Sequence, residues 1–274
     1  MDKTQQPPGY TFPDRKLKRK LSSPTRIPLV LVACGSFSPI TYLHMRLFEV
    51  ARDWTKFNTD YEVVGCFLSP VGDKYVKAGL ASAPHRLNMC ELATRDSEMI
   101  DVDPWEAYMK EYQPTAIVLD HFDYEINEKI GGIETGEGQQ KAKARIALLA
   151  GADLIQTFSA PGVWSEKDLD HILNNYKIFA VERAGTDIDD ALATLGQKFK
   201  DNIYVVHQLI QNDVSSTKIR LFLKRDMSVR YLIPQPVIQY IDEHGLYGDD
   251  GTSSVHDKEK GKAIEPASSS SNGP

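Results

Sequence analysis

The stretch "IPLVLVACGSFSPITYLH", Ile27 to His44, decides which fold the sequence predicts. Its first half is a short run of apolar residues, which is typical of a strand buried on both faces. Gly35 and Ser36 end the run, and Pro39 is suited to the opening of the helix that the following residues predict. A strand, a tight turn and a helix in this order indicate the first unit of a parallel α/β sheet.

The rest of the chain repeats this alternation of short apolar runs and longer helical patterns. The pattern predicts a single domain over residues 28–248, built as a Rossmann-like, doubly wound parallel sheet with helices on both faces. The strands are expected within 28–34, 62–69, 115–119, 145–151, 177–182 and 203–208. The helices are expected at 41–56, 84–95, 166–175, 187–199, 216–224 and 234–244.

Three segments lack such a pattern. Residues 1–27 are rich in Pro, Lys, Arg and Ser and are expected to form a disordered basic leader. Its basic run "RKLKRK", Arg15 to Lys20, is either a solvated charge run or a nuclear address. Residues 249–274 are polar and of low complexity, and a disordered tail is expected there. Residues 122–144 are Gly-rich and charged, which indicates a mobile surface loop.

Composition excludes several classes of protein. The chain has 274 residues, with 32 Lys and Arg against 38 Asp and Glu, and the net charge of -6 argues against a nucleic-acid-coating protein. No apolar run approaches a membrane span, so no membrane partner is expected. The three cysteines, at positions 34, 66 and 90, have no metal-type spacing and fit a reducing compartment. We expect a soluble protein of the nucleus or cytoplasm; a homo-oligomer stays open.

The turn after the first strand has the features of a phosphate site. Ligands of open parallel sheets bind beyond the carboxyl ends of the strands. Gly35 and Ser36 let backbone N–H groups approach an anion, and the following helix adds partial positive charge at its N-terminus. Thr41 and His44 are three residues apart and share one face of that helix. His44 can therefore reach a ligand in the turn, although its spacing alone fits a core histidine equally well.

A second helix start lies in "NDVSSTKIRLFL", Asn212 to Leu223. Ser215 or Ser216 can cap it, and Lys218 and Arg220 lie just inside. Cations in a first helical turn oppose the helix dipole unless an anion binds there. The segment is therefore either a second phosphate site or a capped, solvated helix.

Together, the two turns resemble those of the nucleotidyltransferase superfamily, which carries an early "TxxH" or "HxGH" element and a late "SSTxxR" element. Here they read "TYLH" and "SSTKIR". The segments "SPVGDKYVKAGL", "VDPWEAY", "GADLIQTF", "PGVWSEKDL" and "VERAGTD" are similar to those of eukaryotic nicotinamide-mononucleotide adenylyltransferases, over roughly residues 28–247. The chain departs from many members at Ser38, where they carry Asn.

The resemblance implies that the 5′-phosphate of nicotinamide mononucleotide attacks the α-phosphorus of ATP, giving NAD and pyrophosphate. Nicotinate mononucleotide would give deamido-NAD. The attacking phosphate is already an anion, so the protein has to align two polyanions and neutralise charge rather than supply a nucleophile. Mg²⁺ is expected as a cofactor carried mainly by the ATP phosphates, without a metal site made by the protein.

The resemblance also assigns residues. His44, Lys218 and Arg220 would be catalytic. ATP would bind at Gly35, Ser36, Phe37, Thr41, His44, Gly151, Asp153, Ser215, Ser216, Thr217, Lys218 and Arg220. The mononucleotide would bind at Ser36, Lys77, Trp105, Asp153, Trp164 and Arg183.

Each assignment has a simpler alternative. The two tryptophans would stack on the pyridinium ring, but they could equally be packing residues. Lys77 could be an exposed loop lysine, and Asp153 a carboxylate at the edge of the core. The fold also admits a cytidylyltransferase, a pantetheine-phosphate adenylyltransferase or a nucleotide-binding protein without turnover. Because no motif clearly places a charge at the carboxamide, we expect both mononucleotides to be accepted, with Glu106 as the side chain that could discriminate between them.

Overall fold

The computed structural model describes residues 4–136, 140–158, 160, 162–182, 202–210 and 212–248, without the side chains of Ala152 and Asp153. A six-stranded sheet in the order β3-β2-β1-β6-β7-β8 forms its centre. Each strand of this sheet pairs in parallel with its neighbours. The predicted Rossmann-like α/β fold is confirmed. The strands are β1 Ile27–Gly35, β2 Tyr61–Pro70, β3 Ile100–Val102, β6 Arg145–Gly151, β7 Lys177–Val181 and β8 Ile203–Val206.

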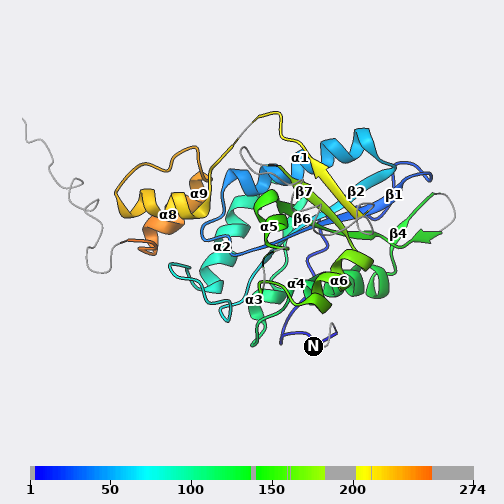
Figure 1. Ribbon diagram of the computed structural model, residues 1–274, viewed down its shortest axis with the longest axis horizontal. Coiled ribbons are helices and arrows are strands. Elements are labelled where there is room, and N and C mark those ends of the chain that lie inside the picture. The colour runs from blue at the N-terminus through cyan, green and yellow to red at the C-terminus, as the bar shows by residue number, and fades with distance from the viewer. Residues whose placement is uncertain are drawn as a thin grey trace, which may run out of the picture.

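Helices cover both faces of the sheet, with α1 on one side and α4 and α6 on the other (Figure 1). The helices are α1 Tyr42–Asn58, α2 Ala83–Thr94, α3 Trp105–Tyr108, α4 Thr115–Asp123, the π-helix Tyr124–Lys129, α5 Ala152–Thr157, α6 Glu166–Asn175, α8 Ser216–Lys224 and α9 Gln235–Glu243. Strand β1 is apolar throughout because both of its faces are buried. Leu29 and Leu31 pack into the core on one side of the sheet, and Val30 and Val32 pack into the core on the other.

The direction in which successive strands are added to the sheet changes between β1 and β6. Successive strands run from β1 outward to β3, and after the crossover from β6 outward to β8. The carboxyl ends of β1 and β6 therefore flank the switch point at which open α/β sheets bind their ligands.

Two secondary-structure predictions are corrected. Residues 115–119, "TAIVL", are not a strand but the first half of α4, which begins directly after Pro114. A short apolar run does not distinguish a buried strand from a buried helix, and Ala116 and Leu119 are buried one helical turn apart. The true third strand, β3, has three residues and was missed because so short a run carries no period. The helix predicted at 187–199 lies outside the described residues.

The predicted disordered leader is wrong for residues 4–27. Phe12, Leu17 and Leu21 are buried in the core, and the Lys16 ammonium donates to two backbone carbonyls. The apolar residues are unevenly spaced along an irregular segment, so they gave no periodic signal. The basic run is therefore partly a structural contact. Its role as a nuclear address stays a prediction.

The predicted mobile loop at 122–144 is also wrong for the described part. Phe122, Ile126 and Ile133 are fully buried, and the π-helix continues α4 directly. A short antiparallel pair, β4 Ile133–Glu134 and β5 Lys141–Ala142, closes the segment. The tail 249–274 lies outside the described residues. Within the described part of the chain, none of the helices has the length and apolar character that a membrane crossing requires.

Candidate active site

The turn that follows β1 is built to bring backbone close to a ligand. Phe37 has a left-handed backbone (φ 44°), and its ring packs over Gly35. A Cβ at position 35 would lie 3.1 Å from that ring, so the glycine permits the turn. Ser38 follows, fully buried, and its peptide bond to Pro39 is cis. The predicted phosphate turn thus has a defined conformation at the switch point.

His44 is locked to the start of α1. Thr41 caps the helix, with its Oγ1 accepting the His44 N–H, while the Thr41 N–H donates to His44 Nδ1 at 3.0 Å. A backbone N–H can only donate, so Nδ1 is the unprotonated nitrogen and the neutral ring carries its hydrogen on Nε2. Burial lowers the pKa of His44 to about 4. Around neutral pH, the side chain is a neutral hydrogen-bond donor through Nε2.

The second predicted turn lies directly against the first. Ser215 caps α8 by accepting the Lys218 N–H at 3.2 Å. The Ser216 hydroxyl donates to the carbonyl of Pro39 at 2.8 Å, and Arg220 Nη1 donates to the carbonyl of Ser38 at 2.8 Å. The fold therefore brings together two motifs that are far apart in the sequence.

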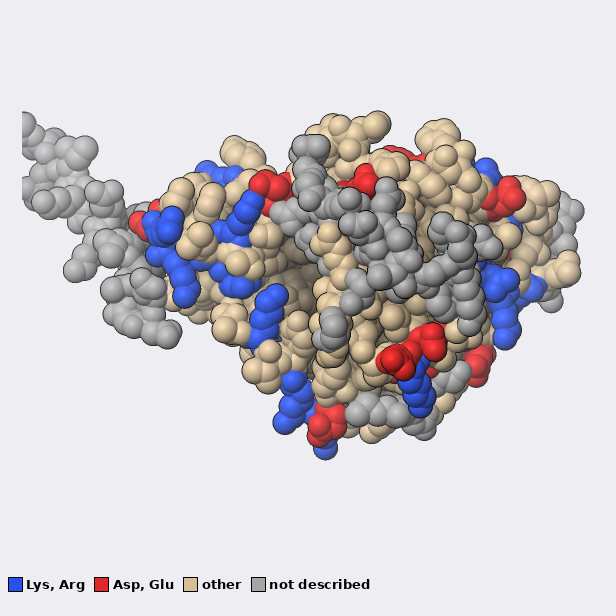
Figure 2. All heavy atoms as spheres, in the orientation of Figure 1, with Lys and Arg blue, Asp and Glu red and all other residues tan. Residues whose placement is uncertain are grey.

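This junction is a hollow edged by cations. Helices α8 and α9 lie together beyond one end of the sheet (Figure 1), and Figure 2 shows a depression where they meet the sheet, with Lys and Arg side chains around it. Half-buried Arg220 belongs to the junction through its bond to the Ser38 carbonyl, and Lys218, exposed in the same helix, pairs with Asp213. A concave, cationic surface at helix N-termini suits a polyphosphate.

The loop that carries Lys77 passes the same place. Lys77 is exposed between β2 and α2, and a Cβ added to Gly79 would lie 3.5 Å from Arg220 Nε. Gly151 ends β6 beside β1. The side chain of Asp153 and the whole of Arg183 lie outside what the structure describes, so their assignments stay predictions.

The two predicted tryptophans have different surroundings. Trp105 is fully buried, stacks on His121 with ring centres 4.2 Å apart, and donates its Nε1–H to the carbonyl of Gln5. No part of its ring is exposed to a ligand here, so the geometry favours the packing alternative. Trp164 is half-buried, with its edge on Phe158 and its Nε1–H donated to Thr157 Oγ1. It remains the tryptophan accessible to a ligand.

An aromatic residue that sequence reasoning missed is Tyr112. It is 45% exposed and lies nearly parallel to Tyr75, with ring centres 6.2 Å apart. Burial raises the pKa of its hydroxyl, and the charges of Glu106 and Asp168 raise it further, which places Tyr112 near α3 and the start of α6. Its position in "WEAYMKEY", the segment that begins with Trp105, was the available signal.

Arg86 is the second residue that the sequence analysis missed. It is buried in α2, and its guanidinium donates to the carbonyls of Ser36, Val71 and Ala81 at 2.6–3.1 Å. These carbonyls belong to the turn after β1, the end of β2 and the segment before α2. One side chain therefore ties together three segments that surround the site.

Glu106 is buried on α3, and the Ser69 hydroxyl donates to its carboxyl group at 2.7 Å. Burial raises the pKa of Glu106 to about 8, although the Ser69 hydrogen bond and the charge of Arg86 oppose the shift. The carboxyl group is therefore largely protonated at neutral pH. Among the described residues, no group of three or more His, Cys, Asp and Glu side chains could hold a metal ion.

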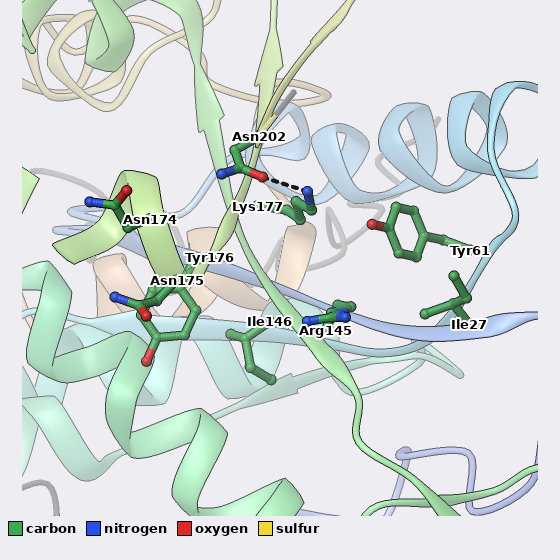
Figure 3. Close-up of a pocket in the computed structure, with 9 residues that line it drawn as sticks. All are labelled: Ile27, Tyr61, Arg145, Ile146, Asn174, Asn175, Tyr176, Lys177 and Asn202. Carbon is green, nitrogen blue, oxygen red and sulfur yellow. Dashed lines mark hydrogen bonds between the residues drawn. The ribbon is translucent and has the colours of Figure 1, made fainter. Parts of the chain in front are cut away.

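A separate cavity of about 200 Å³ lies at the other end of the strands from the two turns. Figure 3 shows Ile27, Tyr61, Arg145 and Lys177 around it, which are the first residues of β1, β2, β6 and β7. The cavity thus lies at the amino ends of the strands and contains none of the predicted site residues. We therefore place the candidate active site at the carboxyl ends, where the two turns meet.

Comparisons with known proteins identify the fold and the family of the chain. A family model described as cytidylyltransferase-like matches residues 32–222, which include both turns. A nicotinic acid mononucleotide adenylyltransferase from Plasmodium falciparum, solved in complex with NaAD, has the same fold. Its TM-score is 0.59 at 21% identity, over 81% of this chain and 98% of that one.

Three curated relatives are more similar in sequence, and each is named nicotinamide/nicotinic acid mononucleotide adenylyltransferase. The protein numbered 1 from Saccharomyces cerevisiae is 51% identical over 88% of this chain and 60% of its own length. The Schizosaccharomyces pombe protein is 52% identical over 88% of this chain and 66% of its own length. The protein numbered 1 from Bos taurus is 38% identical over 81% of this chain and 89% of its own length. The chain thus spans about 60% of the Saccharomyces cerevisiae relative's length, but most of the bovine one. On these matches, the chain belongs to the nicotinamide/nicotinic acid mononucleotide adenylyltransferases of the cytidylyltransferase-like family.

Proposed function

We propose that this chain transfers the adenylyl group of ATP to nicotinamide mononucleotide or nicotinate mononucleotide, releasing pyrophosphate and forming NAD or deamido-NAD. The observation that carries the proposal is the contact between the two turns. Arg220 and Ser216 bond the backbone of Ser38 and Pro39, so one triphosphate can extend from the turn after β1 to the start of α8. The names of the relatives support the choice of substrates.

The reaction requires alignment and charge neutralisation. The mononucleotide phosphate attacks the α-phosphorus, the bond between the α-phosphorus and the bridging oxygen breaks, and pyrophosphate leaves with the electron pair. His44 donates its Nε2–H to the α-phosphate, while the backbone N–H groups of the turn after β1 hold the attacking and transferred phosphates. Lys218 and Arg220 neutralise the departing pyrophosphate.

His44 does not have to change its protonation state in this scheme. Its pKa near 4 and the donated Thr41 N–H keep the ring neutral across the working range of pH. No proton moves from the attacking phosphate, which is already ionised. Turnover should therefore not follow a histidine titration between pH 6 and pH 8.

Mg²⁺ fits this site as a companion of ATP rather than as a resident ion. The described residues contain no carboxylate cluster that would hold it, so the phosphate oxygens of ATP and water would be its main ligands. Bound there, it supplies positive charge to the phosphates. Chelation should then abolish turnover but leave the melting temperature of the free protein unchanged.

The burial of Glu106 agrees with acceptance of both mononucleotides. Its carboxyl group is almost fully covered and accepts the Ser69 hydroxyl, so it presents no exposed charge to the carboxylate of nicotinate mononucleotide. We expect catalytic efficiencies for the two substrates within about a hundredfold, the range that modest pocket differences cover. Measuring both efficiencies in one buffer tests this. A difference of several thousandfold would show that a charged side chain distinguishes the carboxamide from the carboxylate.

One assay separates the proposed function from its alternatives. Pyrophosphate release is measured with ATP or CTP, each with nicotinamide mononucleotide, phosphocholine or pantetheine phosphate. The proposal predicts release only with ATP and a pyridine mononucleotide. Release with CTP or with another acceptor would contradict the substrate assignment, and ATP binding without any release would indicate a binding protein. A homo-oligomer and a nuclear or cytoplasmic location stay predictions, testable by light scattering and by imaging.

A further inference from the structure

Ser38 is held by three hydrogen bonds at the centre of the turn after β1. Its Oγ accepts the Ala81 N–H at 3.0 Å and lies 2.7 Å from the hydroxyl of Tyr247. Its carbonyl accepts Arg220 Nη1. The side chain is fully buried, so water does not compete for these bonds. Ser38 is thus one of the points at which the last part of the domain contacts the turn after β1.

Tyr247 is aimed at this point by the backbone. It follows α9, and its φ of 67° is in the left-handed region, which is uncommon for a bulky residue. Gly245, at φ 58°, turns the chain just before it. Such a conformation persists when surrounding contacts hold it, and here the hydroxyl bond to Ser38 is one of them.

Helix α9 is itself fixed, so Tyr247 has a firm support. The Tyr240 hydroxyl bonds His85 Nδ1 and Asn88 Nδ2, each at 2.9 Å, and both partners belong to α2. Burial raises the pKa of Tyr247 to about 12, so its hydroxyl keeps its proton at all working pH values. Deprotonation of Tyr247 therefore does not break the contact with Ser38 in that range of pH.

We propose that Tyr247 is a positioning residue, which fixes Ser38 and, through the Ser38 carbonyl, the side chain of Arg220 in the arrangement that binds the ATP phosphates. The inference rests on the proposed function, because it assigns Tyr247 a role in ATP handling.

The variant Tyr247→Phe removes one oxygen and retains the ring. Ser38 keeps its bond to Ala81, so the fold survives, but the turn and Arg220 lose one of their constraints. We expect the affinity for ATP to fall about tenfold, because a small displacement of a phosphate-binding group is costly to catalysis and binding. The KM for the mononucleotide should change less than twofold.

A double-mutant cycle and a matched control distinguish positioning from general stability. In the presence of Ser38→Ala, the substitution Tyr247→Phe should have no further effect on ATP affinity, because the two hydroxyls act as one unit. The control is Tyr176→Phe, which removes a hydroxyl that donates to Asp120 of α4, near the amino ends of the strands and away from the turn. It should lower the melting temperature without altering ATP affinity.

The decisive readout is calorimetry with a non-hydrolysable ATP analogue, which measures ATP affinity without requiring turnover. If the wild-type chain binds the analogue but forms no NAD, the proposed function fails, while the positioning role is still decided by the affinities. An affinity of Tyr247→Phe within twofold of wild type would overturn the inference. So would an equal loss in Tyr176→Phe, or additive losses in the double variant.

Discussion

Replacing Arg86 by Met tests whether one buried side chain holds the walls of the site together. Met keeps much of the volume and the helix propensity but removes the guanidinium. Three backbone carbonyls, those of Ser36, Val71 and Ala81, then lose a charged donor at once. The exposed Asp73 adds little, because its carboxylate is well solvated.

The expected cost follows from these contacts. A hydrogen bond to a charged group contributes about 1.5 kcal/mol or more, so three of them give a loss of about 4–5 kcal/mol in the free energy of unfolding. For a domain of this size, such a loss corresponds to a fall in melting temperature of about 8–20 °C. The variant should also bind ATP more weakly, since the Ser36 carbonyl belongs to the turn after β1.

Urea unfolding followed by circular dichroism measures the loss directly. Arg52→Met is the matched control, because Arg52 lies on the exposed face of α1 and its ion pair with Glu49 is solvated. The control should change the free energy of unfolding by less than about 0.5 kcal/mol. A loss below about 1 kcal/mol in Arg86→Met would show that the three carbonyls find other donors, and the argument would be refuted.

Three further predictions concern other parts of the molecule. His44→Ala should lower kcat by at least about a hundredfold while the melting temperature falls only slightly, since the loss affects the charged transition state. Steady-state kinetics and a thermal melt measure both quantities, and an unchanged kcat would contradict the prediction. Deleting residues 1–24 should cost at least about 4 kcal/mol of stability, because burial of Phe12, Leu17 and Leu21 is lost, and an unchanged urea midpoint would contradict the burial. Glu106 has a folded-state pKa near 8 against an ordinary value of 4.5, so its native carboxyl group holds a proton that the unfolded chain has released. Its contribution to stability therefore falls as pH rises from about 5 to 8, and Glu106→Gln should gain in melting temperature relative to wild type over that range, whereas a constant difference would refute the shifted pKa.

The turns of the site were predictable because their signals are local. A strand that ends in Gly-Ser and a serine cap followed by Lys218 and Arg220 each carry their physical reason within a few residues. The junction of the two turns then follows from parallel topology, which brings the carboxyl ends of the strands to one side of the sheet.

The features that the sequence did not reveal concern residues whose surroundings depend on distant partners. Arg86 occupies an ordinary helical position, and only the folded chain brings three carbonyls around it. Trp105 has a motif that resembles a ligand contact, yet its ring is covered by His121 and by the N-terminal segment. The contacts of residues 4–24 likewise arise from tertiary packing, which composition alone does not reveal.

The most direct measurement of the central claim is product formation by the purified chain given ATP, Mg²⁺ and nicotinamide mononucleotide. The account predicts NAD and pyrophosphate in equal amounts, with the rate falling at least about a hundredfold in both His44→Ala and Arg220→Ala, while each variant remains folded. A folded wild-type chain that binds ATP but forms no NAD, or variants that keep the full rate, would contradict it.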